Sequence, residues 1–175
     1  MLTPGVRGEG LIVRDEVVGG TIPREFVKPA MDGAREALDV GALAGFPMVD
    51  AICTLIGGSF HDVDSSDIAF RIAASMAVQD AAAKATPILL EPIMKLEISS
   101  PEEYTGGVIG DLSGRRGSVN RMDARTGVQV IGAEAPLASM FGYATDLRSA
   151  TQGRASFTMQ FHQYAEVPPV ISQEI

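Results

Sequence analysis

The sequence lacks most of the residues that build disulfide frameworks and metal centres. Among its 175 residues there is one cysteine, there are two histidines, and tryptophan is absent. One cysteine excludes a disulfide framework, and together with two histidines it cannot supply the four ligands of a structural zinc site. Cys53 lies in the apolar run 51–56, so we expect a buried packing residue and a cytoplasmic protein.

Long hydrophobic runs and excess positive charge are missing too. No segment approaches the roughly 20 apolar residues of a membrane helix, and residues 1–5 do not begin a signal peptide. We therefore expect no membrane contact. The net charge is −8, which argues against gripping nucleic acid over the whole surface. A local contact with nucleic acid is compatible with this charge, because Arg115, Arg116, Arg121 and Arg125 form one basic region.

Motifs for nucleotide chemistry are absent. The sequence contains no Gly-Lys-Ser/Thr, so it has no phosphate-binding P-loop. The glycine-rich stretch 106–110 falls inside a predicted helix and not after a strand. We interpret these glycines as positions of close helix packing, and we expect neither a cofactor nor a catalytic residue in this chain.

The polar stretch 61–67 is the most informative segment, because it connects an apolar strand to a long apolar helix. It resembles half of a calcium loop, but it lacks the glycine and glutamate that such a loop needs, so we expect no metal. An acid–base role for His61 beside Asp62 and Asp64 is an alternative. We favour an exposed loop histidine, since no nucleophile or second carboxylate cluster lies nearby in sequence.

The chain divides into two predicted units that join near residues 86 and 87. In the first, strands over 10–18 and 48–56 alternate with an amphipathic helix and an apolar helix over 65–84. Pro29 suggests that the regular part of the first helix begins there. The second helix has so few polar residues that we expect other structure to cover most of it.

The second unit reads as strand, helix, two strands, helix and strand. Residues 93–98 alternate, a helix starts at Pro101, and a hairpin over 118–125 and 128–133 turns at Thr126-Gly127. A second helix starts at Pro136, and the last strand directs Ala155, Phe157, Met159 and Phe161 to the core. This βαββαβ order predicts a ferredoxin-like sheet covered by two helices on one face. The other face offers Ser156, Thr158 and Gln160, which cannot stack RNA bases.

Several long motifs in this sequence, in the same order, resemble bacterial elongation factor G. The likeness extends from about residue 10 to residue 164. The matching motifs are Gly19–Pro23, Leu43–Asp50, Gly58–Ser66, Leu90–Lys95, Val108–Leu112, Arg115–Gly117 and Met140–Ser149.

The resemblance implies an α+β protein that forms the C-terminal portion of such a translocase. Residues 1–86 would be most of domain IV, an incomplete ribosomal-protein-S5-like βαβα unit without its first strands. Residues 87–175 would be domain V, the ferredoxin-like sandwich, with a frayed tail after residue 167. GTP and Mg²⁺ would bind the family's GTPase domain, which is missing here, so this chain by itself would not be an enzyme.

The resemblance also implies the sites and the partners. A tip loop would contact tRNA and mRNA in the A site of the small-subunit decoding region. From the residue types themselves we expect Asp64 to cap the helix that follows. Arginines of domain V would contact large-subunit rRNA near the stalk-base protein. The tip-loop residues are Ser59, Phe60, His61, Asp62, Val63, Asp64, Ser65 and Ser66, and the rRNA-contacting residues are Arg115, Arg116, Arg148 and Arg154.

Two further hypotheses stay open. A stand-alone, non-catalytic ribosome-binding module or regulator, derived from an elongation factor G paralogue, would have the same motifs. The first unit would also leave apolar surface uncovered if it has only two strands, and such a surface would favour self-association.

Overall fold

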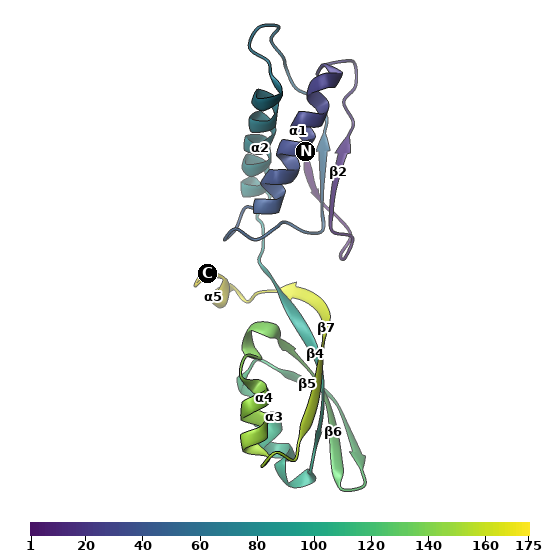
Figure 1. The fold of residues 1–175 in the computed structure, drawn as a ribbon, viewed down its shortest axis with the longest axis vertical. Coiled ribbons are helices and arrows are strands. Elements are labelled where there is room, and N and C mark those ends of the chain that lie inside the picture. The colour runs from purple at the N-terminus through teal and green to yellow at the C-terminus, as the bar shows by residue number, and fades with distance from the viewer. The chain divides into compact units, whose positions relative to one another are not determined.

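The computed structural model describes all 175 residues and divides the chain into two compact units (Figure 1). The first contains Met1–Ile88 and the second contains Leu89–Glu174. Each has its own hydrophobic core and its own sheet. This mixture of sheets and helices confirms the predicted α+β class.

Unit 1 has a three-stranded sheet with the order β1-β3-β2. Strand β3 (Ala51–Leu55) lies in the centre, parallel to β2 (Leu11–Asp15) and antiparallel to β1 (Leu2–Pro4). Strand β1 was not predicted, because three residues that include a proline show no alternation of apolar and polar side chains. Their strand conformation comes from pairing with β3, in which Leu2 lies opposite Cys53.

Two helices pack against one face of this sheet. Helix α1 (Arg24–Val40) contributes Ala34, Ala37 and Leu38 to the core, and α2 (Asp67–Lys84) contributes Val78. Cys53 lies among them with 6% of its surface exposed, as predicted, and burial raises the pKa of its thiol. The sheet adds the partly buried side chains of Leu2, Leu11 and Val13 to the same core.

The prediction that regular helix begins at Pro29 was wrong, because α1 already begins at Arg24. Pro29 lies in the second turn, where a proline removes one backbone hydrogen bond without preventing the helix. The first turn is held in other ways. The Phe26 backbone N–H donates to the Pro23 carbonyl at 3.0 Å, and the Phe26 ring stacks on Phe70 of α2 with centroids 4.7 Å apart.

Helix α2 is much less covered than its composition suggests. Only Val78 and Ala82 are buried along it. Ile68, Ile72 and Met76, which we call the α2 stripe, are 70%, 54% and 63% exposed. The expectation of cover on most sides was wrong, because α1 and the sheet contact only one side of α2.

The contact between α1 and α2 depends on a glycine. A Cβ atom at Gly33 would lie 2.1 Å from the backbone carbonyl oxygen of Arg71, so the helices could not keep their present separation. The glycines at 106, 107 and 110 behave differently, since a Cβ at any of them would meet nothing within 4 Å. Their interpretation as positions of close packing was therefore wrong.

Unit 2 has a four-stranded antiparallel sheet with the order β5-β6-β4-β7, and α3 and α4 cover one face (Figure 1). This is the predicted ferredoxin-like arrangement. The hairpin turns where it was predicted to, with Gly127 in the left-handed region at φ 75°. The elements are β4 (Leu90–Ser100), α3 (Thr105–Gly114), β5 (Ser118–Arg125), β6 (Val128–Pro136), α4 (Tyr143–Ala150) and β7 (Ser156–Glu166), with short 3₁₀ turns at Glu102–Tyr104 and Leu137–Ser139.

The end of the chain differs from its prediction in two ways. Phe157 of β7 packs edge-on against the buried Tyr143, but Met159 and Phe161 are 38% and 55% exposed, so only the first part of β7 reaches the core. A short helix, α5 (Pro169–Ser172), occupies the tail that was expected to fray. A proline at its first position has the φ that a helix start requires.

We expect Gly33→Ala to destabilise unit 1 by about 1–3 kcal/mol, because the added methyl group must push α2 away. Gly107→Ala introduces the same methyl group into a helix with open space around it. This control should stabilise unit 2 by about 0.5–1 kcal/mol through helix propensity. Urea unfolding followed by circular dichroism measures both changes, and equal effects of the two substitutions would contradict the packing role of Gly33.

Candidate functional site

The tip loop, Ser59–Ser66, lies at one end of unit 1 in the connection between β3 and α2 (Figure 1). All of its residues are exposed except Ser65, which is half-buried. Val63 at the turn is 90% exposed. The loop therefore presents its side chains and backbone outward and encloses nothing.

Two serines brace this loop from within. The His61 backbone N–H donates to Ser65 Oγ at 2.8 Å, and the Ser65 N–H donates back to the His61 carbonyl at 3.1 Å. Ser66 caps α2, because its Oγ accepts from the Ala69 N–H at 3.2 Å. The expectation that Asp64 caps this helix was wrong, since the serine at the N-cap position already accepts the bond.

The structure adds a second loop, residues 16–23 between β2 and α1, to this end of unit 1. A Cβ at Gly57 would lie 3.1 Å from Thr21 Oγ1, and one at Gly58 would lie 3.1 Å from Ile22 Cδ1, so the end of this second loop contacts the two glycines that lead from β3 into the tip loop. Gly19 and Gly20 both have positive φ angles. The Gly-Gly pair was the available signal for a turn here, but nothing in the sequence indicated that the residues after it contact Gly57 and Gly58.

The charge of the tip determines how it could meet RNA. Asp62, Asp64 and Asp67 are exposed, and residues 56–70 contain neither lysine nor arginine. Carboxylates repel phosphate oxygens, so attraction to a phosphate backbone cannot hold this loop in place. Its usable groups are hydroxyls, backbone N–H groups and the imidazole of His61, which suit short-range hydrogen bonding.

Arg115 at the end of α3 is surrounded by acceptors of its own chain. Its Nε donates to Asp111 Oδ2 at 2.9 Å, its Nη1 donates to the Ser139 and Phe141 carbonyls at 2.9 and 3.3 Å, and its Nη2 donates to Asp146. Burial lowers the pKa of this guanidinium, but the hydrogen bonds to the two carboxylates outweigh it and raise the pKa above its usual value.

Arg116 and Arg154 also have partners within unit 2. Arg116 has a positive φ of 62°. Both of its Nη atoms donate to the carboxylate of the buried Glu91, and the Nη1–Oε2 distance is 3.1 Å. Arg154 lies 2.7 Å from Glu103, donates to the Tyr104 hydroxyl and lies over the Tyr104 ring. The hydrogen bond to the Tyr104 hydroxyl is the main reason why the pKa of Arg154 is raised.

Arg148 is the exception among the four predicted arginines. It is exposed on α4, and its side chain has neither an ion pair nor a hydrogen bond. The structure therefore does not gather the four arginines into one free cationic patch. It leaves Arg148 available and uses the other three to hold unit 2 together.

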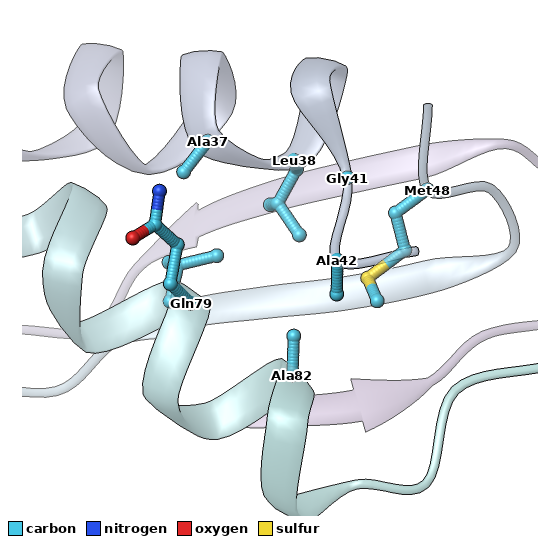
Figure 2. Close-up of a pocket in the computed structure, with 8 residues that line it drawn as sticks. Ala37, Leu38, Gly41, Ala42, Met48, Gln79 and Ala82 are labelled. Atoms are coloured by element: carbon cyan, nitrogen blue, oxygen red, sulfur yellow. The ribbon is translucent and has the colours of Figure 1, made fainter. Parts of the chain in front are cut away.

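Neither notable cavity suits a small substrate. The cavity in Figure 2 lies between Leu38, Met48 and Ala82 and has a volume of about 10 Å³, the size of one water molecule. An open groove between α1 and α2 has about 280 Å³ and is lined mainly by charged side chains. No group of three or more His, Cys, Asp or Glu side chains could hold a metal ion. None of the helices combines the length and hydropathy of a membrane span.

Comparison with known proteins accounts for nearly the whole chain. Residues 1–86 match the family model "Elongation factor G, domain IV", and residues 88–175 match "Elongation factor G C-terminus". A crystal structure of a protein from Thermus thermophilus superposes with a TM-score of 0.85 at 39% sequence identity. The match covers 99% of this chain and 26% of that protein, so the chain spans about a quarter of its relative.

We expect Ser66→Ala to destabilise unit 1 by about 1 kcal/mol, because the first turn of α2 loses its cap. Asp64→Ala removes an exposed loop side chain that makes no capping bond, and it should change the free energy of unfolding by less than about 0.5 kcal/mol. Urea unfolding separates the two. A larger loss for Asp64→Ala would show that the aspartate caps α2 in solution.

Proposed function

We propose that this chain, which belongs to the elongation factor G family, is the ribosome-contacting C-terminal part of a translation factor. That factor promotes GTP-dependent translocation of tRNA and mRNA. GTP hydrolysis belongs to another part of the factor, since this chain spans about a quarter of its relative and its sequence has no P-loop. The chain then contributes the contacts that convert that chemistry into movement.

The exposed, internally braced tip loop is the observation that carries this proposal. It enters the decoding region of the small subunit and occupies space beside the tRNA–mRNA duplex in the A site. Ser65 and Ser66 hold its shape, and the Phe26–Phe70 stack joins the first turns of α1 and α2 behind it. A stiff loop of this kind opposes backward movement of the duplex, because it yields little when RNA presses on it.

Hydrogen bonding is the means by which the loop meets the duplex. Its carboxylates repel phosphate, so the contact uses hydroxyls, N–H groups and His61 at close range. Such a contact depends on fit and discriminates against a misplaced duplex more than it adds affinity. Unit 2 supplies the electrostatic contact, through Arg148, with large-subunit rRNA near the stalk-base protein.

A second candidate is a stand-alone ribosome-binding module without catalysis. The separate cores of the two units favour it, since each unit forms a core from its own residues. The α2 stripe supports a further partner, another copy of the chain, because three large apolar side chains follow one another along an exposed helix face. Ribosome binding by the chain alone tests the stand-alone module. Light scattering of the free chain then distinguishes a monomer from an assembly of two or more copies.

We expect His61→Ala to slow single-round translocation about fivefold in a full-length factor that carries this chain. Loss of one hydrogen bond of about 1 kcal/mol corresponds to such a factor. The exposed side chain of His61 has no intramolecular hydrogen bond, so folding should be unaffected. His162→Ala, on the sheet of unit 2, is the matched control and should leave the rate unchanged. An unchanged rate for His61→Ala would refute the role of the tip.

We expect Arg148→Gln to weaken binding of the chain to large ribosomal subunits. The magnitude of the slope of log affinity against log salt concentration should also decrease by roughly 0.7–0.9, the value for one phosphate contact. Titration over a series of KCl concentrations at fixed Mg²⁺ measures both quantities. Arg121→Gln is the control, because it removes the same charge from an arginine that pairs with Asp123 at 2.8 Å. Equal slopes for wild type and Arg148→Gln would exclude the phosphate contact.

A further inference from the structure

We infer that Arg115 is a positioning residue: it holds α4 so that Arg148 faces the RNA, and it does not bind phosphate itself. This inference rests on the proposed function, because it concerns how unit 2 meets large-subunit RNA. It separates two arginines that sequence reasoning had given the same role.

Four of the five N–H donors of Arg115 are already occupied. Its Nε, Nη1 and Nη2 reach one carboxylate on α3, two backbone carbonyls before α4 and one carboxylate on α4. The side chain is only 15% exposed. A phosphate group could form the two parallel hydrogen bonds of a forked contact with this guanidinium only after displacing one of these acceptors.

Helix α4 needs such an external support. It has eight residues, too few for a helix to be stable alone. Its N-cap is Gly142, which has no side chain to accept from the first turn. Arg115 contacts this end three times: through the Phe141 carbonyl, through Asp146, and through the Tyr143 ring, whose centroid lies 5.3 Å from the guanidinium carbon.

The other end of α4 is held as well. Thr151 Oγ1 donates to the Leu147 carbonyl at 2.7 Å and accepts from the Ala155 N–H at 3.2 Å. Arg154, in the connection to β7, pairs with Glu103. The first end of this short helix is therefore tied to the end of α3, and its last end leads into a connection that is itself tied to the turn before α3, which leaves its orientation little freedom.

Arg148 follows Asp146 by two residues, which is about 200° around an α-helix. Drawing Asp146 toward Arg115 on α3 therefore turns Arg148 to the opposite side, where it is exposed and has no partner. If the Arg115–Asp146 contact is lost, the buried Tyr143 and Leu147 still hold α4 against the core, but its first turn is no longer tied to α3 and can fray. Arg148 then presents its charge in many directions, and binding loses the benefit of a fixed geometry.

The decisive test is Asp146→Asn in the 175-residue chain, titrated with large ribosomal subunits at fixed Mg²⁺. If Arg115 positions α4, affinity should fall about threefold, even though the substitution removes a negative charge. If Arg115 itself contacts phosphate, the same substitution frees it and affinity should rise. Asp123→Asn is the control with the same change of charge, and it should not lower affinity, because Asp123 pairs only with Arg121 on β5.

A charge-conserving variant provides the second arm. Lysine cannot reproduce the forked contacts of arginine, so Arg115→Lys should weaken binding in the wild-type background and have no further effect in an Arg148→Gln background. Independent losses in such a double-mutant cycle would overturn the inference. Urea unfolding of each variant verifies that unit 2 is folded. Failure of the wild-type chain to bind large subunits would instead refute the proposed function.

Discussion

The close contact of α1 and α2 at Gly33 supports everything that unit 1 presents at its tip. Because Gly33 has a hydrogen in place of a side chain, the backbone of α2 at Arg71 can approach α1 directly. This separation lets Phe26 stack on Phe70 and lets Val78 reach Ala34 and Leu38 in the core. The tip loop ends one turn before Phe70, so the packing of α1 against α2 determines the direction in which the loop points. A loop that acts as an obstacle needs such a base, because its own hydrogen bonds determine only its local shape.

Unit 2 illustrates how an acidic protein uses its few arginines. Three of them connect different segments of unit 2 by forming an ion pair with a carboxylate of the same unit. They are Arg115, Arg116 and Arg154. Removal of the partner of Arg115 or Arg116 would leave a charge in a partly desolvated place, whereas Arg154 and Glu103 form an exposed pair. Arg148 differs because it has no carboxylate to contact. The number of arginines in a sequence is therefore a poor measure of the positive charge that a partner molecule can meet.

Much of this architecture was readable because the signals were local. The alternation in β4 and β7, the Thr126-Gly127 turn and the helix-forming stretches depend on neighbouring residues, and they gave the ferredoxin-like unit correctly. The errors concern contacts between distant residues. Strand β1 exists because it pairs with β3, α1 continues through Pro29 because Phe26 stacks on Phe70, and Gly107 faces solvent although its motif suggested packing.

For the candidate site, the sequence alone determined the family, the exposed polar loop around His61 and the set of arginines, because each is a matter of residue type and order. Only the tertiary structure decided that Thr21 and Ile22 contact the two glycines before that loop, that Ser66 and not Asp64 caps α2, and that Arg148 alone of the four keeps a free guanidinium. The physical reason is the same in each case. The state of a polar group depends on which partner the fold brings within hydrogen-bonding distance, and those partners lie on other elements or compete with neighbours for the same donor.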